Sequence, residues 1–352
     1  MSDFYDGTKL MSHKDINGNK PEIIICTSNR NAGKTTFFNR FCVKKFLKLG
    51  EKFCIVVRYA YETSDAANKF FKEIGSLFFP NYRMTSRARS NGIYTELFLH
   101  EKNDTNKNGI PCGYCVAINN SDNIKKVSHL LADTKRMIFD EFQSEQNKYC
   151  PNEVNKFISI HMSIARGGGE QVKFLPVYMI SNHVTILNPY YTALGIAARL
   201  QTDTTFLHGD GWVLEQGFNE SASNANKESA FNRAFANNSY VNYATELTYL
   251  NDNTSFVEKM KGKARYLFTL RRNNKNFGVR LYDDKGIVYI NESPDITGGK
   301  FYACTIDDMT QDTILVTPLN PFVDILRSYF NYGALRFSSI ECKDAIFLMI
   351  SY

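Results

Sequence analysis

The sequence of 352 residues predicts an α/β domain built on a mostly parallel sheet, followed by a smaller α+β domain. Up to about residue 200, short apolar runs alternate with segments of helical period, the order expected for a parallel sheet covered on both faces. Residues 201–255 are rich in Asn, Ser, Ala and Thr, and from about residue 256 period-2 strands are joined by short turns. We therefore expect a first domain at 1–200, a linker with polar helices at 201–255 and a second domain at 256–352.

The first predicted elements form one βαβ unit over residues 22–58. It consists of a strand at Glu22–Cys26, a helix at 35–49 that ends at Gly50 as its C-cap, and a buried strand at Phe53–Val57.

A helix and a β-hairpin are expected next. Ser64 is the predicted N-cap of a helix at 64–78, and residues 93–118 have the pattern of a hairpin around a polar turn. Within that hairpin, Cys112 and Cys115 have the C-x-x-C spacing of redox and zinc sites. Because no second pair completes a tetrahedral site, we interpret them as part of a strand, with a redox or metal site as the alternative.

Three later elements complete the first domain in this prediction. They are a strand at Lys135–Phe142, a helix at Asn152–Ala165 that Gly167–Gly169 ends, and a strand at Leu175–Asn182. In the second domain, "ARYLFTLRR", "NFGVRLYDD" and "GIVYINE" predict an antiparallel meander, and a final helical run at 321–337 closes the domain.

Composition narrows the class of protein. An apolar content of 43% and a charged content of 22% are those of an ordinary globular chain. No apolar run reaches about 18 residues and the N-terminus is unlike a secretory signal, so we expect no membrane span and a cytoplasmic location. Most of the eight cysteines lie in apolar runs, which predicts small buried side chains. The net charge of +6 is compatible with a polyanionic partner and does not by itself indicate one.

The stretch TSNRNAGKTT, residues 27–36, follows a strand and opens a helix, as a phosphate-binding loop requires. Backbone N–H groups of such a loop and the helix N-terminus attract phosphate oxygens. Lys34 would contact the β- and γ-phosphates and the Thr35 hydroxyl would bind Mg²⁺. Ser28 stands where the usual motif has its first glycine, so we expect weaker or altered nucleotide affinity. The alternative is a lysine at an ordinary helix start. The predicted nucleotide-binding residues here are Ser28, Asn29, Arg30, Asn31, Ala32, Gly33, Lys34, Thr35 and Thr36.

Polar residues also end the later strands of the first domain, at the sheet edge where ligands of open α/β sheets bind. Asp140 would hold Mg²⁺, and Glu141 would orient and deprotonate the attacking water in ATP hydrolysis. Asn182, which follows Ser181, would contact the γ-phosphate and couple hydrolysis to motion; a capping role is the alternative. Arg58 would either touch phosphate or pair with a carboxylate.

These motifs together resemble a known family. "TSNRNAGKTT", "CIVVRYAYE", "MIFDEF", "PNEVNKF", "ARGGGE" and "MISNHVTILNPYY" are similar in order and spacing to the DNA-packaging (encapsidation) ATPases of small tailed phages with protein-primed genomes, relatives of the large terminase motors. The resemblance is strong over about residues 20–200 and weak beyond. It implies a P-loop ATPase domain of the ASCE type that uses ATP and Mg²⁺.

The resemblance also implies partners and a second site residue. It implies a homomeric ring, a pentamer, that binds double-stranded DNA and docks on the portal of an empty capsid in the host cytoplasm; a structural packaging RNA is a further candidate partner. Arg166 matches the family's arginine finger, which acts on a neighbouring subunit, with Gly167–Gly169 as its adaptable loop. A cation at a helix C-terminus is the alternative for Arg166. Lys125 and Lys126 lie near the family's second trans-acting basic residue.

The second domain is expected to resemble an RNase H-like nuclease without the active-site carboxylates. Asp283 and Asp284 at one strand end and Glu292 at the next are not enough for a two-metal cluster. A basic strip would contact the DNA backbone without reading sequence, and a solvated sheet face is its alternative. The basic strip comprises Lys259, Lys261, Lys263, Arg265, Arg271, Arg272 and Lys275, of which Lys259, Lys261, Lys263, Arg271 and Arg272 are the predicted DNA-binding residues. A second basic stretch, in the first domain, contains Arg83, Arg87 and Arg89.

Three functions are compatible with these features. The first is an ATP-driven motor that moves double-stranded DNA into a preformed capsid. The second is a terminase that also cuts DNA through its C-terminal domain. The third is a nucleotide-dependent DNA-binding or scaffold protein that does not hydrolyse ATP.

Overall fold

A nine-stranded sheet organises the first of two units into which the chain divides, Met1–Asn251 and Asp252–Tyr352. The computed structural model describes residues 5–102, 108–166, 171–197, 199–200, 204–246, 249–250, 252, 255–295, 299–317 and 319–350. In these ranges no helix is long and apolar enough to cross a membrane.

The strand order of the first unit is β3-β4-β5-β2-β6-β7-β1-β9-β8. The six central strands, β5, β2, β6, β7, β1 and β9, run parallel to one another. Strands β3 and β4 at one edge and β8 at the other are joined by antiparallel pairing. This confirms the predicted mostly parallel sheet. The strands are β1 (Ile23–Ser28), β2 (Lys52–Val57), β3 (Tyr82–Arg89), β4 (Tyr94–Glu101), β5 (Ile110–Ala117), β6 (Thr134–Asp140), β7 (Val177–Asn182), β8 (Phe206–Gly209) and β9 (Trp212–Gln216).

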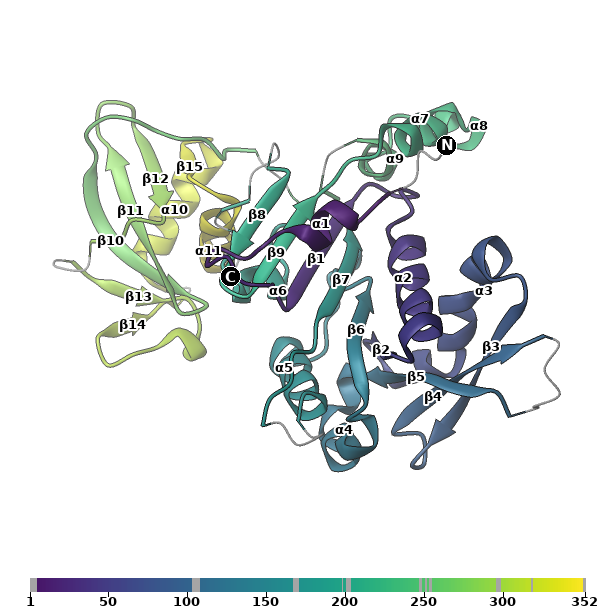
Figure 1. Cartoon of the computed structure of the whole chain (residues 1–352). Helices are drawn as coiled ribbons and strands as arrows, with labels where there is room; N and C mark the ends of the chain where they lie inside the picture. Colours follow the sequence, from purple (N-terminus) through teal and green to yellow (C-terminus); the bar gives the residue numbers. More distant parts are fainter. Residues whose placement is uncertain are drawn as a thin grey trace. The chain divides into compact units, whose positions relative to one another are not determined.

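Helices cover both faces of this sheet (Figure 1). On one face Phe38 of α2 packs against Tyr178, with ring centroids 5.2 Å apart. On the other, Phe157 of α5 lies 5.7 Å from Phe139. The strands buried between these layers are accordingly almost wholly apolar. The helices are α1 (Thr8–Ser12), α2 (Lys34–Leu49), α3 (Ala66–Phe78), α4 (Ser121–Val127), α5 (Glu153–Ile164), α6 (Pro189–Ala193), α7 (Glu220–Glu228), α8 (Ala230–Ala234) and α9 (Ser239–Thr245).

Most predicted elements of this unit are confirmed, with two local differences. The βαβ unit is β1, α2 and β2, with Gly50 in the left-handed conformation of a C-cap, although β6 and β7 lie between its strands. The predicted N-cap at Ser64 is wrong. Ser64 lies in a short 3₁₀ helix, Ala60–Asp65, where its hydroxyl donates to the carbonyl of Tyr61. That 3₁₀ turn precedes α3, so α3 begins two residues later than predicted.

The hairpin prediction is confirmed by β4 and β5, and β3 pairs with β4 as a further strand. Cys112 and Cys115 are buried in β5, and burial raises the pKa of each thiol. All eight cysteines are buried and free. The strand interpretation of the C-x-x-C pair therefore holds.

The predicted linker at 201–255 differs from the structure. Strands β8 and β9 extend the main sheet, because β9 pairs in parallel with β1. Three polar helices, α7 to α9, follow. The apolar stretch Trp212–Leu214 is buried in the sheet, and the Asn- and Ser-rich composition on its C-terminal side obscured it.

The second unit is an α+β fold on a six-stranded sheet of order β14-β13-β10-β11-β12-β15. The predicted meander is confirmed by β10, β11 and β12, and the other three strands join in parallel. The helix predicted at 321–337 stops at Asn331, because Gly333 turns left-handed and the chain enters a strand. The elements are β10 (Arg265–Arg272), β11 (Lys275–Tyr282), β12 (Ile287–Asn291), β13 (Phe301–Ala303), β14 (Thr313–Leu315), α10 (Pro321–Asn331), β15 (Leu335–Phe337) and α11 (Ile340–Ile350).

Candidate functional site

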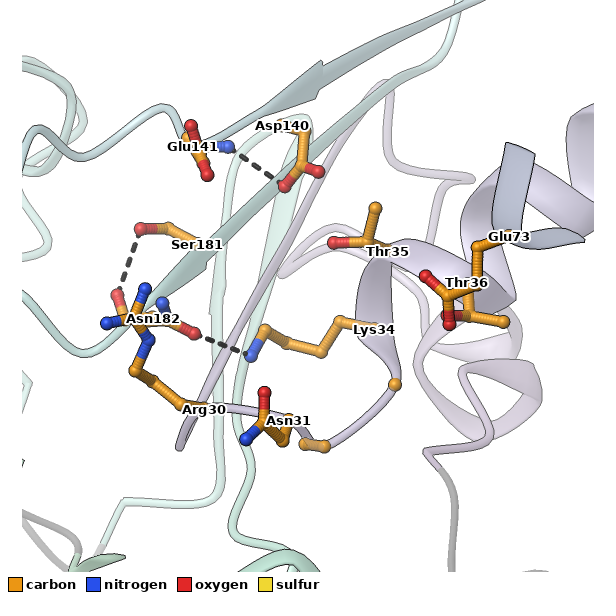
Figure 2. Close-up of a pocket in the computed structure, with 12 residues that line it drawn as sticks. Arg30, Asn31, Lys34, Thr35, Thr36, Glu73, Asp140, Glu141, Ser181 and Asn182 are labelled. Atoms are coloured by element: carbon orange, nitrogen blue, oxygen red, sulfur yellow. Dashed lines mark hydrogen bonds between the residues drawn. The ribbon is translucent and has the colours of Figure 1, made fainter. Parts of the chain in front are cut away.

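The candidate site lies at the carboxyl ends of β1, β6 and β7. Parallel pairing sets Ser28 beside Asn182, and Asp140 beside Ile180, so the ends of these neighbouring strands converge. They border a cavity of about 400 Å³ (Figure 2). Its lining residues are Arg30, Asn31, Ala32, Gly33, Lys34, Thr35, Thr36, Glu73, Asp140, Glu141, Ser181 and Asn182.

The loop between β1 and α2 makes its tight turn without a glycine at its first position. Ser28 ends β1 as an ordinary strand residue. The left-handed conformations fall on Asn31, with φ of 62°, and on Gly33, with φ of 93°. Asn tolerates this region better than other residues with a Cβ, and Gly adopts it freely. The loop can therefore form with Ser28 in place of glycine.

Lys34 is buried and held by oxygen atoms of the loop. Its ammonium donates to the Ser28 hydroxyl at 2.9 Å, to the carbonyls of Asn29 and Ser28 at 3.0 and 3.2 Å, and to Oδ1 of Asn182 at 3.2 Å. Burial lowers the pKa of Lys34 to about 8. Ser28 thus supplies a hydroxyl partner for the lysine that would meet the phosphates.

Asp140 and Glu141 face the cavity from the end of β6 (Figure 2). Burial and the neighbouring charge of Glu141 raise the pKa of Asp140, and a hydrogen bond from Thr35 opposes that shift. A cation beside Asp140 would relieve this penalty, and Mg²⁺ typically takes one or two carboxylates together with substrate phosphates. Thr35 and Asp140 therefore fit the role of magnesium ligands.

Glu141 occupies a constrained turn. Its φ is 56°, unusual for a residue with a side chain, and its N–H donates to Oδ1 of Asp140 at 2.9 Å. Its exposed carboxylate lies 3.3 Å from the ammonium of Lys69 on α3. One turn further along α3, Glu73 accepts a hydrogen bond from Thr36 at 2.9 Å. Lys69 and Glu73 were not predicted from the sequence, because they lie on an amphipathic helix with no motif.

The side-chain oxygen of Asn182, at the end of β7, accepts a hydrogen bond from Lys34, as Figure 2 shows. The hydroxyl of Ser181 donates to the Asn182 carbonyl at 2.9 Å. Both residues line the cavity, whereas a role in sensing the γ-phosphate stays a prediction.

Three other predicted basic residues lie away from the cavity lining. Arg166 is exposed just beyond the end of α5, and the glycines that follow it lie outside the described residues. Lys125 and Lys126 are exposed on α4, where they bond to Asp122 and Asn123 at 3.1 Å each.

Arg58 takes the carboxylate-pairing alternative. Its Nε lies 2.9 Å from Oε2 of Glu153, and both side chains are largely buried. Its other nitrogens reach the backbone carbonyls of Glu141 and Phe142. Arg58 is therefore occupied by protein groups beside the cavity.

Residues 219–243 contact the phosphate loop, which the linker prediction missed. Asn29 and Asn219 exchange two hydrogen bonds, of 2.9 and 3.0 Å. Asn31 donates to Asn226 at 2.9 Å. Because these pairs join positions at least 190 residues apart, the only local signal was the run of asparagines.

The loop arginine makes a further contact to the same helical segment. Arg30 lies 3.7 Å from Oε1 of Glu145 and bonds to the Tyr240 hydroxyl. Tyr240 and Tyr243 of α9 also donate to Glu145, at 3.0 and 3.2 Å. Residues of α7 and α9 thus contact the loop between β1 and α2.

In the second unit, the predicted DNA-binding residues fall into two groups. Lys259, Lys261 and Lys263 are exposed. Arg271 and Arg272 are only partly exposed: Arg271 bonds to Asn274 and Asn276, and Arg272 lies 3.7 Å from the buried Asp308. These internal partners make the two arginines weaker candidates for DNA contact than the sequence indicated.

A parallel sheet with a phosphate loop after its first strand and an acidic pair opposite that loop is the architecture of P-loop ATPases. The protein is therefore an ATPase. More specifically, the chain belongs to the Podovirus DNA encapsidation protein (Gp16) family, whose sequence model matches residues 1–351. This agrees with the resemblance drawn from the motifs.

Individual relatives extend over nearly the whole chain. The DNA packaging protein of Bacillus phage phi29 is 23% identical over 340 residues, covering 96% of this chain and 93% of its own length. That of Bacillus phage B103 is 24% identical, covering 88% and 90%. In solved structures, the bacteriophage Phi-29 viral genome packaging motor assembly matches with a TM-score of 0.69 at 20% identity, covering 97% of each chain. The Phi-28 gp11 DNA packaging motor matches with a TM-score of 0.58 at 16% identity, covering 99% and 98%. The chain therefore shares the fold of these two solved structures.

Proposed function

We propose that this chain is the ATP-hydrolysing subunit of a homomeric ring that drives double-stranded DNA into a preformed capsid. The observation that carries the proposal is the position of Asp140 and Glu141 on the same cavity as Lys34 and Thr35. A phosphate cradle facing a carboxylate pair is suited to hydrolysis, because one acid can hold a metal while the other accepts a proton from water.

Each residue has a distinct task in the proposed reaction. Loop N–H groups, the start of α2 and the ammonium of Lys34 bind the phosphates. Asn182, which accepts a hydrogen bond from Lys34, would contact the γ-phosphate and couple hydrolysis to motion. Thr35 and Asp140 would hold Mg²⁺, which would neutralise charge on the transferred phosphoryl group. Glu141 takes the proton of the attacking water.

The titration of Lys34 predicts that ATP binds more weakly at alkaline pH. With its pKa lowered to about 8, Lys34 is charged below pH 8 and loses its proton above it. We expect the Kd for ATP to rise roughly tenfold per pH unit above pH 8, measured by calorimetry at saturating Mg²⁺. The variant Lys34→Arg should bind less tightly but without this slope, because guanidinium stays charged. An equal slope in both proteins would assign the titration to another group.

The same lysine has the opposite effect on folding of the nucleotide-free protein. Between pH 8 and 10.5 the unfolded chain holds the Lys34 proton more often than the folded chain does. The contribution of this group to the free energy of unfolding therefore rises with pH across that window.

The ring and its partners are part of the proposal. A neighbouring subunit would supply Arg166 to each site, and the ring, which we propose to be a pentamer, would dock at the capsid portal in the host cytoplasm. A structural packaging RNA is a further proposed partner. Family membership and the exposed position of Arg166 support this arrangement.

We propose that Lys259, Lys261 and Lys263 contact the DNA backbone in the second unit. Replacing all three with Gln should flatten the dependence of DNA affinity on salt, by about 0.9 in log–log slope for each phosphate that is no longer neutralised. Fluorescence anisotropy with two unrelated duplexes over a salt series measures this slope. A control that replaces Lys44, Lys48 and Lys72, exposed lysines of α2 and α3, should leave it unchanged. Equal flattening by both sets would contradict a specific role for the first.

DNA cutting by the second unit is the less favoured alternative. Asp283, one of the acids that could have bound metal, pairs with Arg265 at 3.0 Å, which also lowers the pKa of Asp283. The expected result is that the full-length chain does not nick supercoiled DNA in Mg²⁺ or Mn²⁺. The nuclease-like character of this unit remains our proposal.

A further inference from the structure

We propose that Glu153 is a positioning residue for ATP hydrolysis: acting through Arg58, it fixes the backbone turn that carries Glu141. The proposal rests on the assignment of Glu141 as the base. It adds a residue that touches neither nucleotide nor water and that no motif for phosphate binding contains.

Glu153 is among the most enclosed carboxylates of the first unit. Its side chain is 1% exposed, and it begins α5. Both of its oxygens accept from Nε of Arg58, at 2.9 and 3.1 Å. Oε2 also accepts from the backbone N–H of Cys150 at 2.7 Å, and Oε1 from the hydroxyl of Tyr190 at 3.0 Å. A buried carboxylate that accepts from this many donors has its orientation fixed.

Tyr190 strengthens this arrangement from a third segment of the chain. Burial and the nearby Glu153 carboxylate raise the pKa of Tyr190, so its hydroxyl remains protonated and donates. Its ring packs edge-on against Phe142, with centroids 5.8 Å apart. Glu153 therefore connects the end of β2, the start of α5 and the start of α6.

The opposite edge of the Arg58 guanidinium holds the turn after β6. Nη2 donates to the carbonyl of Phe142 at 2.7 Å, and Nη1 to that of Glu141 at 3.4 Å. The guanidinium carbon lies 5.1 and 5.7 Å from the rings of Tyr149 and Phe139, which limits its movement. One planar group is thus bonded to Glu153 on one side and to the catalytic turn on the other.

The turn needs such support because of its conformation. Glu141 has φ of 56°, a region that residues with a Cβ seldom adopt unless neighbouring contacts hold them there. Its N–H bond to Asp140 fixes one side of the residue, and the Arg58 bonds fix the other. The carboxylate of Glu141 is itself exposed and contacts only Lys69 among the described side chains that bond to it, so its direction depends on that ion pair and on the backbone beneath it.

The test is the variant Glu153→Gln in the full-length chain. The amide keeps the shape of the carboxylate but not its charge, so Arg58 should release the turn. We expect kcat for ATP to fall about 10- to 100-fold while KM changes less than about threefold, because a small displacement of a catalytic group acts on the chemical step. In a Glu141→Gln background, Glu153→Gln should lower hydrolysis no further.

The matched control is Glu51→Gln. Glu51 pairs with Arg136, which is buried in the same unit at the other end of the sheet. Both variants leave a buried arginine without its counter-charge, so both should lower the melting temperature. Only Glu153→Gln should lower kcat.

Two results would overturn the proposal. One is a kcat for Glu153→Gln equal to that of Glu51→Gln at comparable loss of melting temperature. The other is a further loss of hydrolysis in the Glu141→Gln background. If Glu153→Gln does not fold, Tyr190→Phe removes one bond to Glu153, and a kcat lowered by less than about twofold would equally count against it. Normal hydrolysis by Glu141→Gln alone would instead refute the proposed base, a separate outcome.

Discussion

Replacing Glu141 with Gln is expected to lower ATP hydrolysis by about 10²- to 10⁴-fold while ATP still binds. The amide cannot accept the proton of the attacking water. Glu141 makes no hydrogen bond to the phosphate loop; its contacts in the described chain are with Asp140, Lys69 and Arg58. The groups that bind phosphate therefore remain in place. Steady-state phosphate release measures the rate of hydrolysis, and the Kd for ATP, measured on the same preparation, shows whether binding is retained.

Glu96→Gln is a suitable control for this variant. Glu96 is a carboxylate of the same unit, paired with Arg89 at 2.7 Å on the antiparallel edge of the sheet. Its replacement removes one negative charge without touching the cavity, so hydrolysis should persist. Undiminished turnover in Glu141→Gln would show that another group is the base. A wild-type chain that binds ATP but releases no phosphate, alone or with DNA, would favour the non-hydrolysing alternative.

The sheet and its ligand edge were predictable because their signals are local. Each parallel strand is a short apolar run, and the polar residues after β6 and β7 stand immediately beyond such runs. Parallel pairing then brings Asp140 and Asn182 to one edge whatever the strand order. The order itself, with β6 and β7 between β1 and β2, has no local signal.

The contacts of the phosphate loop were not predictable in the same way. Asn29 and Asn31 bond to Asn219 and Asn226, which follow nearly two hundred residues later. A polar, asparagine-rich stretch is typical of a linker when nothing indicates its partners. Likewise, carboxylate pairing of Arg58 was one of two possibilities, but only the fold brings Arg58 after β2 to Glu153 of α5.

The missing first glycine illustrates how structure changes the meaning of a motif. In the sequence alone, Ser28 indicates a loss of conformational freedom. In the structure the left-handed residues are Asn31 and Gly33, while the Ser28 hydroxyl contacts Lys34 at 2.9 Å. We therefore expect Ser28 to act on ATP affinity through the lysine that it contacts.

Arg166→Ala is expected to lower hydrolysis by assembled rings about 10³- to 10⁵-fold, the range found for arginine fingers. Helix α5 explains why the arginine would act on a neighbour. Its first residue, Glu153, lies beside the chain's own catalytic turn through Arg58. The helix has 12 residues, a length of about 18 Å, and Arg166 lies beyond its far end. Arg166 accordingly does not line the cavity of its own subunit.

Mixed rings test this arrangement directly. Lys34→Ala subunits should bind ATP poorly but keep Arg166, whereas Arg166→Ala subunits should bind ATP but lack the finger. An equimolar mixture is expected to hydrolyse ATP faster than the average of the two separate proteins, because some interfaces combine an intact loop with an intact finger. The control is Lys156→Ala, which removes another cation of α5. Its subunits should hydrolyse ATP without being mixed with another variant. Full activity of Arg166→Ala by itself would leave a helix-terminal cation as its role, and inactive mixtures would place the finger in its own subunit. Complementation would mean that α5 connects two ATP sites. The helix would begin near the proposed base Glu141 of its own subunit and end near the γ-phosphate of the ATP bound by the next subunit.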